Sequence, residues 1–215
     1  MKTNLLSCFI LSFIILSFSS CNPKKALEDK VNETIAEEIA GAAMGTDVET
    51  SNMTNADKAK AEVDVKLNGT SIGFENSMPN FIITKSNDGK LSFLCTLTEK
   101  TENENLHRTL NISYHGQKTL FTLPLTATIT TRDEENKIKA SFFITNLSEK
   151  GIEMKNTNAG TVKLISFSDE EVVFEIDAKG EEMNESKTPF SLVGKIVCKN
   201  PIMTFMGLKK DEIFN

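Results

Sequence analysis

The sequence lacks the side chains on which several common kinds of binding site depend. It contains no tryptophan, one tyrosine and two histidines among 215 residues. Because β-domains that bind glycans usually stack sugars on Trp or Tyr, this shortage argues against glycan binding. His107 and His115 lie eight positions apart on one predicted strand. That separation spans ~26 Å at ~3.3 Å per residue, which is too far for a shared metal site.

Motifs of catalysis and of nucleotide binding are also missing. There is no Gly-rich phosphate loop, no Gly-x-Ser-x-Gly, no His-Glu-x-x-His and no Cys-x-x-Cys. The 24 Lys and Arg residues are outnumbered by 30 Asp and Glu, for a net charge of −6. Since nucleic-acid binding needs a basic surface, we expect no nucleic-acid partner, and no pattern calls for a cofactor.

The first twenty residues have the layout of a secretory signal peptide. Lys2 precedes an apolar run from Leu5 to Phe18 that is interrupted only by serines. This run is short of the ~20 residues that a membrane-spanning helix needs, and no later stretch approaches that length.

The residues that follow, Phe18-Ser19-Ser20-Cys21, resemble the lipobox of bacterial lipoproteins, although Phe18 stands where leucine is usual. The resemblance implies cleavage before Cys21 and a diacylglyceryl group, with fatty acids such as palmitate, on that cysteine. Several acyl chains anchor a protein stably in a membrane. Asn22 lacks the charge of an inner-membrane retention signal, so we expect the outer membrane. The lysines at 24 and 25 favour its periplasmic face over the cell surface.

The mature chain divides into an N-terminal segment, residues 21–61, and a domain, residues 62–215. In the first, Lys24–Met44 reads as a helix with an apolar stripe at i+4 spacing and a C-terminal stop at Gly45. This helix is a solvated stalk, or it docks on the domain or pairs with a second copy. The polar residues 46–61 predict a flexible linker. The stripe consists of Leu27, Val31, Ile35 and Ile39.

From Glu62 onward apolar residues recur with period two, which predicts strands. Asn68-Gly69 is a strong hairpin signal, and turn residues recur without intervening helical patterns. We therefore expect an all-β domain, an antiparallel β-sandwich or open barrel of about ten strands. A lipobox, a linker and a strand-rich domain together resemble the layout of small lipoproteins of Bacteroidota, and this resemblance of layout implies no function.

Two cysteines and four out-of-phase apolar residues are candidates for special roles. Cys95 and Cys198 share the parity of inward residues and, in an oxidising compartment, predict a disulfide; the alternative is two separately buried thiols. Apolar side chains on outward positions form a partner patch if their strands are neighbours. Otherwise a second sheet or the apolar stripe of the helix covers them. The patch residues are Phe143, Val173, Val193 and Val197.

Acidic turns offer the remaining candidate chemistry. If the strands form a simple meander, alternate turns meet at one end and could hold calcium, which prefers carboxylate oxygens. The alternative is that these turns are simply solvated. The candidate ligands are Asp133, Glu134, Glu135, Asp169, Glu170 and Glu171.

These observations favour a lipid-anchored envelope protein that acts as a non-enzymatic binding or assembly module. Its partners would be the membrane, through the lipid, and another envelope protein. The alternative is an envelope hydrolase that uses paired carboxylates from the acidic loops as acid and base.

The lipid anchor gives the first testable prediction. We expect that metabolic labelling with a fatty acid tags the wild-type chain, and that Cys21→Ala is unlabelled and unprocessed because the lipid-accepting thiol is gone. Cys8→Ala, which removes the other N-terminal thiol, is the matched control and should be labelled normally. Labelling that survives Cys21→Ala would show that another residue carries the lipid.

Overall fold

The computed structural model describes residues 45–53, 56–99, 107–130, 137–148, 151–184 and 187–214, with the backbone alone for His107 and Ser148. The predicted signal peptide, the lipidated cysteine and the predicted helix Lys24–Met44 lie outside these residues. Within them the chain is all-β, as the sequence predicts.

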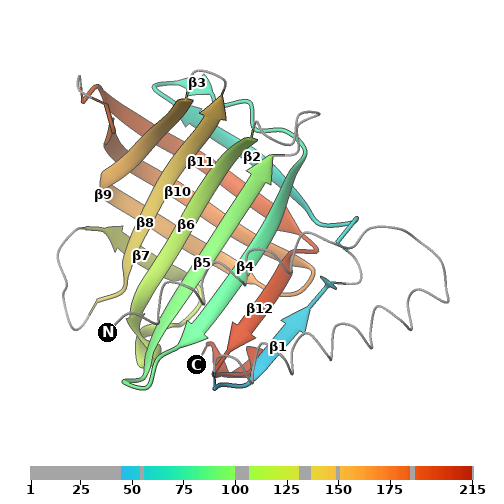
Figure 1. Cartoon of the computed structure of the whole chain (residues 1–215). Coiled ribbons are helices and arrows are strands. Elements are labelled where there is room, and N and C mark those ends of the chain that lie inside the picture. Colours follow the sequence, from blue (N-terminus) through green and yellow to red (C-terminus); the bar gives the residue numbers. More distant parts are fainter. Residues whose placement is uncertain are drawn as a thin grey trace.

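Twelve strands form one mixed sheet that closes into an irregular ring (Figure 1). The strands are β1 (Val48–Ser51), β2 (Lys60–Leu67), β3 (Thr70–Ser71), β4 (Ser77–Lys85), β5 (Lys90–Glu99), β6 (His107–Gln117), β7 (Leu125–Ile129), β8 (Lys139–Ser148), β9 (Gly151–Phe167), β10 (Glu171–Glu182), β11 (Pro189–Lys199) and β12 (Ile202–Met206). Short 3-10 helices cover Lys118–Leu120 (η2) and Lys210–Glu212 (η3).

The ring runs through β4, β5, β6, β8, β9, β10, β11 and β2, each antiparallel to the next. β2 closes it, because it pairs with β11 along its length and with β4 through Ala61 and Ser77. In Figure 1 the ring is flattened into two layers, with β4, β5, β6 and β8 crossing in front of β10 and β11. The long strand β9 joins the layers by pairing first with β8 and then with β10.

The prediction of a purely antiparallel sheet needs correction. β12 is parallel to β4, and β7 is parallel to β8 while antiparallel to β9. β1 pairs with β12 inside the stretch for which the sequence predicts a flexible linker. Neither strand shows a period of two: β12 is apolar at four of its five positions, and β1 has only four residues. The Asn68-Gly69 hairpin is confirmed between β2 and β3, with positive φ at both turn residues.

The interior of the ring is filled by aromatic side chains from both layers. Phe81, Phe93 and Tyr114 come from one layer and Phe174 from the other, and all four are at most 1% exposed. Phe174 stacks on Phe81 at 6.1 Å and on Tyr114 at 6.4 Å between ring centroids, and Phe93 meets Phe81 edge-on at 5.5 Å. Each such pair adds ~0.5–1.5 kcal/mol beyond area burial. These contacts hold the two layers together.

One end of the ring is secured by an arginine. Arg108 of β6 donates two hydrogen bonds to the carboxylate of Glu99, at 2.6 and 2.7 Å, and two to the carbonyl oxygens of Ile72 and Gly73, at 2.9 and 2.6 Å. Its guanidinium also lies 5.0 Å from the ring centroid of buried Phe74. The hydrogen bond from Arg108 holds the pKa of Glu99 below its usual range. Arg108 thus ties the β3–β4 connection to the middle of the sheet.

The end of the ring at the bottom of Figure 1, called the lower end below, is covered by the C-terminal segment, residues 207–214. Leu208 and Ile213 are buried in the core, and Phe214 packs against Phe167 at 5.3 Å between ring centroids. The backbone N–H of Gly207 donates to the carbonyl of Asp47, which fixes this segment beside β1. The interior is therefore covered at this end by the chain itself.

Candidate functional site

The lower end of the ring carries an open hollow of about 670 Å³. Four parts of the chain that are distant in sequence line it: Glu49 of β1, Leu123 after η2, Phe167 at the end of β9, and the C-terminal residues Lys209, Lys210, Asp211 and Phe214. Such a volume lies within the range of ~300–1,000 Å³ typical of ligand pockets. The sequence offered no motif for this hollow, because its residues come together only when the ring closes.

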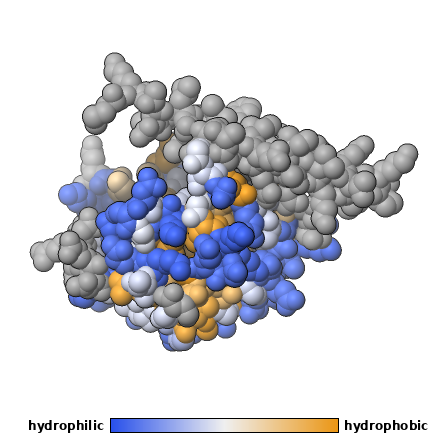
Figure 2. Space-filling model, turned by 90° about the horizontal axis from the view of Figure 1, so that it is seen from below, coloured by the Kyte–Doolittle hydropathy of each residue, from blue (hydrophilic) through white to orange (hydrophobic). Residues whose placement is uncertain are grey.

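The floor of the hollow is aromatic and continuous with the core. Phe167 touches Phe214 on one side, and on the other it meets Phe93 and Phe81 with ring centroids 5.5 and 6.3 Å apart. Both floor residues are half-buried. Figure 2, which views this end directly, shows apolar surface near the centre surrounded by hydrophilic residues. The hollow is therefore an apolar surface with a polar border.

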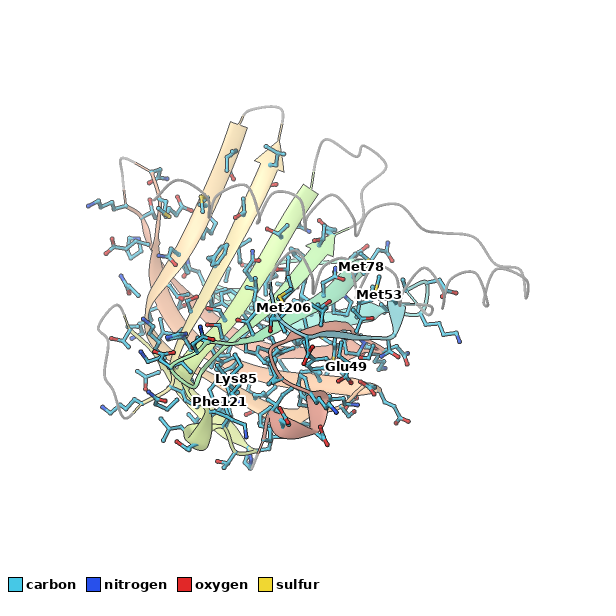
Figure 3. All side chains as sticks on the ribbon, turned by 60° about the horizontal axis from the view of Figure 1, so that its bottom comes forward. Glu49, Met53, Met78, Lys85, Phe121 and Met206 are labelled. Atoms are coloured by element: carbon cyan, nitrogen blue, oxygen red, sulfur yellow. The ribbon has the colours of Figure 1, made fainter. Side chains whose placement is uncertain are left out.

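The rim carries charges of both signs. Glu49, Lys209 and Asp211 are exposed, and Figure 3 shows Glu49 at this end of the molecule. Lys210 forms an ion pair with Asp169, whose carboxylate also accepts a hydrogen bond from Ser51 Oγ at 3.0 Å. The lining of the hollow thus combines the apolar Leu123, Phe167 and Phe214 with four charged side chains.

Of the predicted calcium ligands, Asp133, Glu134 and Glu135 lie outside the described residues. Asp169 is engaged by Lys210 and Ser51. Glu170 and Glu171 are exposed, and their backbone carbonyls accept hydrogen bonds from Asn200 and Ser168. In the part of the chain that the structure describes, no group of three or more His, Cys, Asp or Glu could hold a metal ion.

An acid–base pair of carboxylates needs one member with a raised pKa. Where the described carboxyl groups show a shift, it is downward. A hydrogen bond from Lys199 lowers the pKa of Glu62, Arg108 lowers that of Glu99, and Lys155 lowers that of Glu182. The hydrogen bond from Ser86, followed by that from Lys90, lowers the pKa of Asp88 to about 2. These four groups are ionised at neutral pH and are poor general acids.

The structure separates the residues of the predicted partner patch. Val173 and Val197 are register partners on β10 and β11, but Val173 is only 6% exposed. Val193 is 54% exposed and lies further along β11. Phe143 of β8 is half-buried and pairs with Asn156 of β9, which in turn pairs with Glu181 of β10. Glu181 lies eight residues from Val173, or ~26 Å along the strand, so Phe143 does not share a patch with Val173 or Val197.

Cys95 and Cys198 come from opposite layers and meet inside the ring. Both thiols are free and fully buried, and each belongs to the hydrophobic core. Burial raises the pKa of the Cys95 thiol well above its ordinary value, and a hydrogen bond with Cys198 raises it further. The two sulfur atoms are therefore neighbours, as a disulfide requires.

No family model matches this chain, and neither a curated protein nor a solved structure matches it. Among the described residues no helix is long and apolar enough to cross a bilayer. The geometry of the residues is thus the basis for the proposals that follow.

The disulfide remains a prediction with a direct test. We expect mass spectrometry of the non-reduced mature protein to find the peptides of Cys95 and Cys198 linked. Closing a loop of about 100 residues stabilises the fold by ~4.7 kcal/mol in the chain-entropy model, so reductant should lower the melting temperature. The double variant Cys95→Ala, Cys198→Ala is the control, since its melting temperature should not respond to reductant. Recovery of both thiols in free form from the exported protein would contradict the prediction.

Proposed function

We propose that this chain is a lipid-anchored protein of the cell envelope that acts as a non-enzymatic binding or assembly module, and that the hollow at the lower end of the ring is its binding site. The lipobox-like sequence before Cys21 supports the anchor. Asn22, with the lysines after it, supports the periplasmic face of the outer membrane.

The observation that carries the binding role is the half-buried floor of Phe167 and Phe214 under an open hollow. Aromatic side chains in an accessible depression provide apolar area at low entropic cost, and partners commonly anchor on such sites. Because the aromatic cluster fills the interior behind the floor, a guest enters only to the depth of the hollow. We therefore expect the guest to be one apolar side chain or a short segment of a partner protein.

The carboxylates support binding over hydrolysis. Glu62, Glu99 and Glu182 each hydrogen-bond with a basic side chain that lowers the carboxyl pKa. None of the three lines the hollow. The apolar floor of Phe167 and Phe214 is the feature that favours binding.

Photo-crosslinking in the native envelope tests this proposal. A photoreactive residue replaces Lys209, which is exposed at the rim, or the exposed Lys179 of β10 as the matched control. We expect a discrete adduct, identified by mass, from position 209 and not from position 179. Phe214→Ala should remove the adduct at a cost of about 1 kcal/mol in stability, because a half-buried ring is lost.

Two results would contradict the proposal. The same adducts from both positions would mean that contact is nonspecific. No adduct from position 209, in a protein that melts as the wild type does, would mean that nothing binds at the hollow.

A further inference from the structure

The two outer faces of the ring differ in charge. On β2, β10 and β11 the outward positions alternate between acids, bases and a few apolar residues. Ion pairs cross between strands, as in Lys199–Glu62 at 2.8 Å and Lys163–Glu175 at 3.8 Å. This face is an ordinary solvated sheet surface. Its outward ionisable residues are Lys60, Glu62, Asp64, Lys66, Glu171, Glu175, Asp177, Lys179, Glu181, Lys195 and Lys199.

The outer face of β12, β4, β5, β6 and β8 is different, and we call it the uncharged face. Register and alternation define its central side chains, which include no Asp, Glu, Lys or Arg; Lys90 and Lys139 lie only at its lower margin. Figure 3 labels two of its members, Met78 and Met206. The uncharged face consists of Met78, Asn80, Ile82, Thr84, Ser92, Leu94, Thr96, Thr98, Thr109, Asn111, Ser113, Ser141, Phe143, Thr145, Ile202, Thr204 and Met206.

Several polar groups on this face already bond to one another. Thr96 Oγ1 donates to Asn111 Oδ1 at 2.9 Å, and Asn111 Nδ2 donates to Thr109 Oγ1 at 3.3 Å. The hydroxyls of Ser113 and Ser141 are 2.7 Å apart. A covered polar group costs little when its hydrogen bonds are made within the protein. The apolar members, such as Ile82 and its register partner Leu94, would gain from being covered.

We infer that residues 24–44, as an amphipathic helix, lie across the uncharged face. This segment ends at Met44, four residues before β1 begins, and β1 pairs with β12 at the edge of that face. As a helix of 1.5 Å per residue it would be roughly 31 Å long. The strands from β12 to β8 span roughly 19 Å at ~4.8 Å spacing, so the segment is long enough to cross them.

The side-chain pattern of the segment matches this placement. Its apolar stripe, Leu27 to Ile39, can pack on Ile82, Leu94 and Phe143. Of its acids, Asp29, Glu33 and Glu37 fall on the opposite side of such a helix. The charged face offers no such contact, because its exposed Lys and Glu side chains would lose solvent under an apolar stripe. Docking would also fix the orientation of the domain relative to the membrane, because the lipidated Cys21 lies only three residues before Lys24. Only this consequence depends on the proposed lipid anchor.

The test is intramolecular crosslinking in the full-length, membrane-resident protein. A photoreactive residue replaces Leu94 on the uncharged face, or Lys195 on the charged face as the matched control. We expect peptide mapping to find position 94 joined to residues 24–44 of the same chain, and position 195 not. Val31→Glu with Ile35→Glu should lower this yield at least about tenfold, because two carboxylates would have to leave water. Glu33→Gln with Glu37→Gln should leave it unchanged.

The alternative occupants give distinguishable outcomes. Crosslinks from position 94 to a second copy, shown by mixing tagged and untagged chains, would overturn the inference in favour of a dimer. Crosslinks to another envelope protein, or none in a protein with normal melting, would overturn it as well. The hollow is not involved, so the two proposals fail independently.

Discussion

The closure of the sheet by β2 is the constraint on which the rest of the structure depends. Because β2 pairs with both β11 and β4, every strand of the ring has one inward and one outward face. Glycine permits the closest approach at this junction: a Cβ on Gly194 of β11 would lie 2.1 Å from the carbonyl oxygen of Asp64. Because the sheet is closed, alternate side chains along each strand point either into the ring or outward from it.

Closure also decides where function can reside. The inward residues pack into an aromatic cluster that joins the layers, and the C-terminal segment covers one end. Sites on this domain are therefore surface features: the hollow over Phe167 and Phe214, and the outer faces. The two faces differ in charge, and the apolar members of the uncharged face, such as Ile82 and Leu94, are the ones that would gain from contact with another apolar surface.

The sequence predicted what is local. Alternation located the inward residues of β5, β10 and β11, and Asn68-Gly69 located a hairpin. It did not predict β1, β12 or the first half of β9, because Ile202–Met206 is apolar on both faces and Gly151–Thr161 is largely polar and exposed. The hollow depends on contacts between residues far apart in sequence, which no local pattern encodes. Phe143 shows the same limit: alternation placed it outward, but pairing through β9 separates it from Val173 and Val197.

The filled interior is the central claim, and the composition provides a single reporter for it. Tyr114 is the one tyrosine of a chain without tryptophan. Its hydroxyl is buried and has no hydrogen-bond partner in the described structure, and burial raises its pKa well above the ordinary value of 10.0. A spectrophotometric titration of the folded protein therefore reports on the interior directly. We expect no phenolate absorbance near pH 10, and ionisation only at higher pH, together with unfolding. Ionisation near pH 10 with the fold intact would show that water reaches the interior and would contradict the account.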